Sequence, residues 1–150
     1  MMKQRLQILV ADDEPIVRRS LRMLLEHDGN EVCAVDNGEA ALAQLTERRF
    51  DVVITDFSMP GMQGDQLVAR IRQVQPDQPI IMSTAFVEEY KVFGQAFGSV
   101  DALLFKPFTL KELREAIDLA MARVRPQHAL FLPTALQPLP ATGCVPPTQP

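Results

Sequence analysis

The chain has 150 residues, of which 47% are hydrophobic and 23% charged, and its formal net charge is −4. This composition is typical of a soluble globular protein with one hydrophobic core of ordinary size. The negative charge argues against direct binding to nucleic acid. We therefore expect the local cluster of Arg18, Arg19 and Arg22 to form a solvated helix face, where a protein partner could bind.

The sequence carries no membrane or export signal of the usual kinds. No apolar run reaches the ~18–20 residues of a membrane span, and the apolar stretch near the N-terminus is too short for a secretory signal. The two cysteines, Cys33 and Cys144, lie far apart without metal-ligand spacing. We expect two free thiols in a reducing compartment. These features predict a cytoplasmic protein with no membrane contact.

Hydrophobic patterning predicts five strands that alternate with five helices. In chain order, we expect a strand over 6–13, a helix over 14–29, a strand over 31–36, a helix over 37–49, a strand over 51–56, a helix over 64–74, a strand over 79–85, a helix over 87–98, a strand over 101–107 and a helix over 109–124. Pro15 suits the first turn of the first helix, and Thr109 with Glu112 forms a capping box at the last. Gly94 and Gly98 weaken the fourth helix.

The strands are continuous apolar runs rather than alternating ones, which indicates that helices cover both faces of the sheet. We therefore predict a doubly wound, parallel α/β sandwich. In such sheets, ligands bind beyond the carboxyl ends of the strands, where the strand order switches. This rule directs the search for functional residues to the strand ends.

Polar side chains stand at the ends of four of the five expected strands. They are Asp12, Asp13, Asp56, Ser83, Thr84 and Lys106. Three carboxylates brought together repel one another, and they raise one another's pKa unless a cation intervenes. One lysine cannot balance them, whereas carboxylate oxygens, a carbonyl and waters are the ligands that Mg²⁺ prefers. The strand ends therefore predict a magnesium site.

A site with Mg²⁺, a lysine and a hydroxyl suits phosphoryl transfer, in which positioning and charge neutralisation do most of the work. A carboxylate can itself be the nucleophile and become an aspartyl phosphate. Asp56 is the best candidate, because an open turn rich in glycine and proline follows it. Each residue alone has an ordinary explanation as a helix cap, a surface lysine or strand filler, but their common place at the strand ends predicts a site.

The segment 126–150 differs from the rest of the chain. It holds seven of the 12 prolines and no Asp, Glu, Lys or Arg. We expect residues 1–125 to form one domain and this tail to be mostly disordered or loosely docked. The apolar run 129–133 keeps docking on this domain, or on a second copy, as an alternative.

The chain resembles the receiver domain of two-component response regulators. Four stretches carry the resemblance, in the family's order and spacing: "ILVADDE", "VVITDFSMPGMQG", "IIMSTA" and "LLFKPF". The resemblance covers about residues 5–125. It implies a flavodoxin-like sheet with strand order 2-1-3-4-5 and a phosphoprotein of two-component signalling. It implies a signalling domain rather than an enzyme, with only Mg²⁺-dependent self-phosphorylation from a donor and autodephosphorylation.

The resemblance also implies a role for each matching residue at the cation site. Asp56 is the phosphoacceptor, and it ligates Mg²⁺ (or Mn²⁺) together with Asp13 and the backbone carbonyl of Ser58. Asp12 supports the metal through a water. Gly64 matches the small residue that opens the third helix.

A second group of matching residues concerns the phosphoryl group and its effect. Lys106 contacts the incoming phosphoryl group, and Thr84 turns its hydroxyl toward it afterwards. Leu103 stands at the switch position, which is usually aromatic in this family. We expect Phe86 to shield the acyl phosphate from water. Pro107 matches the proline whose preceding peptide bond is usually cis.

The implied donor is a sensor histidine kinase or a histidine phosphotransfer protein. The signal passes to an unknown output protein or to an output domain beyond this chain. Formation of a homodimer is left as an alternative. A binding module of the same fold that works without phosphorylation is one alternative. A Mg²⁺-dependent hydrolase is disfavoured because Ser58 stands where that class carries a second Asp. A flavin or nucleotide module is disfavoured because acids occupy 12–14, where such modules have a phosphate loop.

Overall fold

A computed structural model of the protein describes residues 4–85 and 99–123. Its elements are β1 (Gln7–Ala11), α1 (Pro15–His27), β2 (Glu31–Val35), α2 (Gly38–Glu47), β3 (Val52–Asp56), α3 (Gly64–Val74), β4 (Ile80–Thr84), β5 (Ala102–Phe105) and α6 (Leu110–Ala122). All five expected strands and four of the expected helices are therefore present. The expected helix over 87–98, Phe86 and the tail 126–150 lie outside the described residues.

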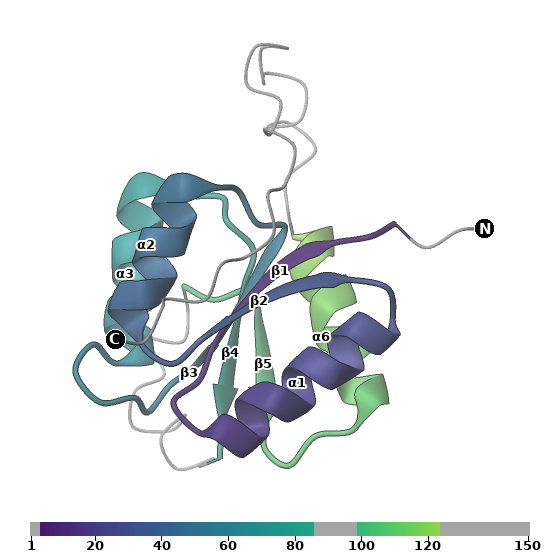
Figure 1. Cartoon of the computed structure of the whole chain (residues 1–150). Coiled ribbons are helices and arrows are strands. Elements are labelled where there is room, and N and C mark those ends of the chain that lie inside the picture. Colours follow the sequence, from purple (N-terminus) through teal and green to yellow (C-terminus); the bar gives the residue numbers. More distant parts are fainter. Residues whose placement is uncertain (1–3, 86–98, 124–150) are drawn as a thin grey trace.

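The five strands form one parallel sheet in the order β2-β1-β3-β4-β5, as the family resemblance implies. Helices α2 and α3 lie on one face of the sheet, and α1 and α6 lie on the other (Figure 1). The predicted doubly wound sandwich is confirmed. Its sheet carries the carboxyl ends of all five strands on one edge, because the strands are parallel.

The sheet is buried on both faces because successive side chains of a strand point to opposite sides. Along β1, Leu9 and Ala11 contribute to one hydrophobic cluster, whereas Ile8 and Val10 contribute to another. The first, here called the α2/α3 cluster, also contains Leu45, Leu67, Val68 and Ile71. The second, here called the α1/α6 cluster, also contains Leu21, Leu25, Leu113 and Ile117. Strands with two buried faces make a rigid support for whatever their ends carry.

Local signals in the sequence set the ends of the helices. Pro15 occupies the first position of α1, and the hydroxyl of Thr109 accepts a hydrogen bond from the Glu112 amide at the start of α6. Asn37 caps α2, since its side-chain oxygen accepts a hydrogen bond from the Ala40 amide at 2.7 Å. Of the helices in the described ranges, none combines the length and apolar character needed to cross a membrane.

The prediction of a free thiol at Cys33 is wrong. Cys33 is completely buried in β2, and it is disulfide-bonded. Its burial was readable from the apolar strand pattern, but the bonding state was not, because chain distance alone does not exclude a disulfide. Cys144 lies outside the described residues.

Helix α3 begins directly against the end of β3, and this approach requires a glycine. A Cβ added to Gly64 would collide with the backbone carbonyl oxygen of Asp56 and would lie 2.8 Å from the Cα of Phe57. The amide of Gly64 donates a hydrogen bond to the Phe57 carbonyl at 2.8 Å. Position 64 therefore requires a small residue because the helix backbone there contacts the backbone at the end of β3.

We predict that Gly64→Ala lowers the free energy of unfolding by about 3 kcal/mol, because the backbone of β3 must shift to admit the methyl group. Gly29→Ala is the matched control. Gly29 has a φ of +88°, but nothing lies within 4 Å of an added Cβ. Its cost, about 1 kcal/mol, is that of the left-handed backbone alone. Urea unfolding of both variants tests this, and an equal or smaller loss at Gly64 would contradict it.

Candidate functional site

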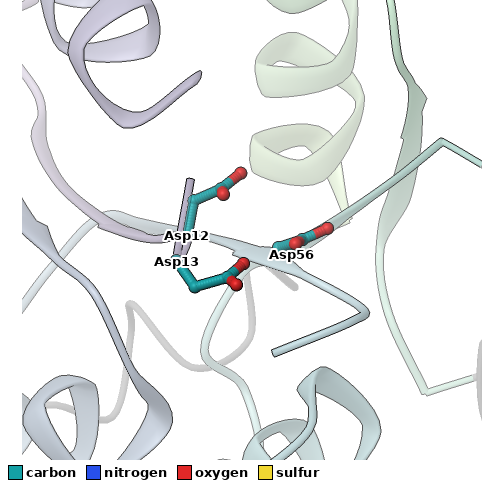
Figure 2. A group of neighbouring side chains, drawn as sticks. All are labelled: Asp12, Asp13 and Asp56. Atoms are coloured by element: carbon teal, nitrogen blue, oxygen red, sulfur yellow. The ribbon is translucent and has the colours of Figure 1, made fainter. Parts of the chain in front are cut away.

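Three carboxylates gather at the carboxyl edge of the sheet (Figure 2). Asp12 and Asp13 follow β1, and Asp56 is the last residue of β3. Each offers an oxygen atom within 4.8 Å of the others. Asp12 and Asp56 are buried, whereas Asp13 is partly exposed. Because β1 and β3 are neighbours in the sheet, the strand pairing itself brings the three groups together.

Lys106, directly after β5, supplies the positive charge of the site. Its Nζ lies 2.9 Å from Oδ2 of Asp12 and 3.2 Å from Oδ1 of Asp56. Its backbone amide donates a hydrogen bond to the Thr84 carbonyl at 2.8 Å, which holds the end of β5 to the end of β4. The peptide bond between Lys106 and Pro107 is cis, as the family resemblance implies. Lys106 thus bridges the acids of two strands.

Asp12 is held by the protein on several sides. Its amide donates to the Val35 carbonyl at 3.1 Å, and its Oδ1 accepts a hydrogen bond from the Glu14 amide at 2.9 Å. Its Oδ2 accepts the hydrogen bond from Lys106 at 2.9 Å. Asp12 therefore orders the start of α1 and the lysine at once, a structural role in addition to the one that the sequence suggests.

Burial raises the pKa of Asp56 to about 6, although the charge and hydrogen bond of Lys106 oppose the rise and the charges of Asp12 and Asp13 add to it. Burial alone would lower the pKa of Lys106. The hydrogen bond to Asp12 and the charges of Asp56 and Asp12 outweigh it, so the pKa of Lys106 is above its usual value. The lysine is therefore charged at neutral pH, and it faces a group of three carboxyl side chains.

The donor set fits a hard divalent cation. Asp12, Asp13 and Asp56 supply only oxygen atoms, in a group compact enough for one ion. Oxygen donors with an excess of negative charge are what Mg²⁺ selects. Ser58 lies on the turn after β3, exposed between the buried side chains of Phe57 and Met59, which anchor that turn in the α2/α3 cluster.

The hydroxyl residues at the end of β4 are both buried. In the register of β4 with β5, Met82 pairs with Leu103 and Thr84 pairs with Phe105. Leu103 packs against the α2/α3 cluster, whereas the next residue of β5 belongs to the α1/α6 cluster, because successive side chains of a strand point to opposite sides. Phe105 is 37% exposed. Ser83, adjacent to Thr84, has a buried hydroxyl with no hydrogen-bond partner among the described residues.

One contact of the site was not predicted from the sequence. Arg19 and Arg22 are exposed, as expected of a solvated helix face, but Arg18 is half-buried. Its Nη1 donates a hydrogen bond to the backbone carbonyl of Asp12 at 2.8 Å. A basic residue close to a helix N-terminus is unusual because it opposes the helix dipole, but Arg19 shares this feature, so the sequence does not single out Arg18.

The sequence matches the family model described as the response regulator receiver domain over residues 8–118. It is 34% identical to the chemotaxis protein CheY-3 of Vibrio cholerae over 126 residues, which make up 82% of this chain and 97% of that protein. The response regulator protein FleR of Pseudomonas aeruginosa is also 34% identical, across 88% of this chain but 28% of FleR.

Solved structures give the same relationship. The response regulator TrrA of Thermotoga maritima, in complex with Mg²⁺ and BeF, has a TM-score of 0.71 and 32% identity, and the match covers 78% of this chain and 99% of TrrA. A response regulator receiver domain protein from Clostridium thermocellum has a TM-score of 0.72 and 31% identity, with 83% and 98% of the two chains covered.

The raised pKa of Asp56 predicts how stability depends on pH in the absence of a divalent cation. The pKa is about 6 in the folded protein against an ordinary value of 3.8, so the folded state binds more protons than the unfolded state between these values. The free energy of unfolding therefore falls as pH rises from about 4 to above 6. At pH 7, Asp56→Asn should be more stable than the wild type by about 1–3 kcal/mol.

Chemical denaturation of both proteins with EDTA, across pH 4–8, measures this difference. Taking the difference cancels the titrating groups that do not interact with Asp56, which the two proteins share. A gap between the two proteins that does not widen as pH rises would contradict the predicted ionisation.

Proposed function

This chain belongs to the response regulator receiver family and is a phosphoacceptor signalling domain, and we propose that Asp56 is the residue that takes up the phosphoryl group. The observation that carries the proposal is the position of Lys106, whose Nζ lies between the carboxylates of Asp12 and Asp56. Asp56 presents a nucleophilic carboxylate at a rigid strand end, beside a fixed positive charge. Asp12 and Asp13 complete an oxygen-rich wall around it.

We infer the following roles at the cation site. Asp13, Asp56 and the backbone carbonyl of Ser58 would hold Mg²⁺ or Mn²⁺ directly, and Asp12 would support it through water. When bound, the ion supplies neutralisation of the charge on the acids and on the transferred group. The Mg²⁺ and BeF in the related TrrA structure support this assignment.

In the proposed transfer, an oxygen of Asp56 attacks the phosphorus of a phosphohistidine. The new O–P bond forms as the P–N bond breaks, and the electron pair of that bond stays on the imidazole nitrogen, which then takes a proton from water. Lys106 balances the negative charge of the phosphoryl oxygens. The nearby carboxylates would repel the phosphoryl group if its negative charge were not balanced. Lys106 must therefore stay in place throughout the transfer.

The proposed switch consists of Thr84 and Leu103. Thr84 ends β4, is 1% exposed, and would turn its hydroxyl toward the new phosphoryl oxygens. Its partner in register is Phe105, and Leu103 lies two residues earlier on the same side of β5. Movement of Thr84 would therefore first displace its neighbours on β5, a strand at the edge of the sheet.

The donor that we propose is a histidine kinase or a phosphotransfer protein in the cytoplasm, where ATP is available to load it. The output is a protein contact or a domain outside this chain. The domain matches nearly the whole of CheY-3 but a minor part of FleR, so relatives of both arrangements exist. Nothing in the charge of the chain favours direct binding to nucleic acid, and self-association of this chain is a further route for the signal.

We predict that incubation with acetyl phosphate and Mg²⁺ adds one phosphoryl group to the wild-type chain and none to Asp56→Asn, because the amide cannot form an acyl phosphate. Intact-mass measurement reads the change directly. Asp118→Asn, a change of the same kind on the exposed face of α6, is the control and should be modified like the wild type. Modification of the Asp56→Asn variant to the wild-type level would refute the assignment.

A further inference from the structure

Arg18 lies one turn into α1, close to the acidic end of the site. Side chains of a helix point back toward its N-terminus, so a long side chain at this position reaches the segment that precedes the helix. Here the guanidinium meets the backbone carbonyl of Asp12 at 2.8 Å. The contact links the first helix to the turn that carries both acids of β1.

The position of Arg18 is costly on general grounds, which indicates that the contact has a purpose. Positive charge near a helix N-terminus opposes the helix dipole, a cost that the acidic segment 12–14 before the helix offsets only in part. The side chain also gives up part of its solvation, since it is half-buried while the neighbouring Arg19 is exposed. A charge-assisted hydrogen bond to a carbonyl compensates for such losses.

The bond acts on a particular peptide group. The carbonyl of Asp12 and the amide of Asp13 belong to one planar unit, so a donor on that oxygen fixes the orientation in which Asp13 leaves it. Asp12 itself is already held through its amide, by the Glu14 amide and by Lys106. Arg18 adds a restraint on the peptide group between Asp12 and Asp13. Asp13 carries the most exposed carboxylate of the three.

We propose that Arg18 is a positioning residue, which orients the Asp12–Asp13 peptide so that the carboxylate of Asp13 faces the cation site. This inference rests on the proposed function, because it assigns Arg18 a part in binding the divalent cation. It makes the first helix a component of the site, although no helix residue supplies a ligand.

Two effects of Arg18 on cation binding have opposite signs, which makes the role measurable. As a nearby positive charge, the guanidinium repels a divalent cation, and its removal would tighten binding. As an orienting donor, it favours binding, and its removal would weaken binding. Arg19→Gln removes the same charge one residue along the same helix without removing a contact to Asp12, and it isolates the first effect.

The experiment compares the full chain with Arg18→Gln, Arg18→Lys and Arg19→Gln, using Mg²⁺ alone as the ligand in calorimetric titrations. We expect Arg18→Gln to weaken Mg²⁺ binding about tenfold, the size of effect seen when groups behind metal ligands are removed. Arg18→Lys, which keeps a charged donor, should recover part of the loss. Arg19→Gln should bind as tightly as the wild type or slightly tighter.

A second readout needs no metal. In EDTA, the amide resonance of Asp13 should shift in Arg18→Gln and stay unchanged in Arg19→Gln, while thermal unfolding verifies that both variants are folded. Equal Mg²⁺ affinity of the two glutamine variants, or an unchanged Asp13 amide in Arg18→Gln, would overturn the role of Arg18. Failure of the wild type to bind Mg²⁺ would instead refute the proposed function on which the role depends, so the two failures are distinguishable.

Discussion

The crowding of three carboxylates, two of which form ion pairs with one lysine, is the interaction on which the rest of this structure depends. Like charges within a few ångströms oppose folding unless they are offset, and Lys106 offsets only part of their repulsion. Part of the electrostatic repulsion between the carboxylates therefore remains unbalanced in the folded protein. A divalent cation at the proposed site would relieve it, and so would protonation of Asp56.

The parallel arrangement of the strands brings these charged side chains together. Parallel strands end at the same edge, so residues about 44 positions apart in sequence meet without any special loop to carry them. The turn after β1 and the turn after β3 are each pinned from behind, by Asp12 bonding to the start of α1 and by Gly64 resting against Asp56. Helices on both faces then prevent the strands from yielding to the repulsion between their ends.

Most of this arrangement could be predicted from the sequence, because it follows from periodicity and from strand ends. The continuous apolar runs predicted a sheet covered on both faces, and the polar residues that end them predicted where the acids and the lysine would gather. What could not be predicted depends on side-chain reach. Arg18 looks like its neighbour Arg19 in sequence, yet only its direction on the helix brings it to Asp12. The disulfide state of Cys33 likewise depends on a contact that no pattern in the sequence encodes.

The two buried faces of the sheet also determine where the molecule can yield. β1, β3 and β4 have strand neighbours on both sides and side chains packed above and below, so they transmit force without deforming. β5 has one strand neighbour, and Leu103 and Phe105 are only partly enclosed. β2 is also a border strand, but only the last residue of β5 adjoins the lysine of the site, so a deformation of β5 reaches the site directly. A protein that binds to β5 would respond to the charge at Asp56 without contacting that residue.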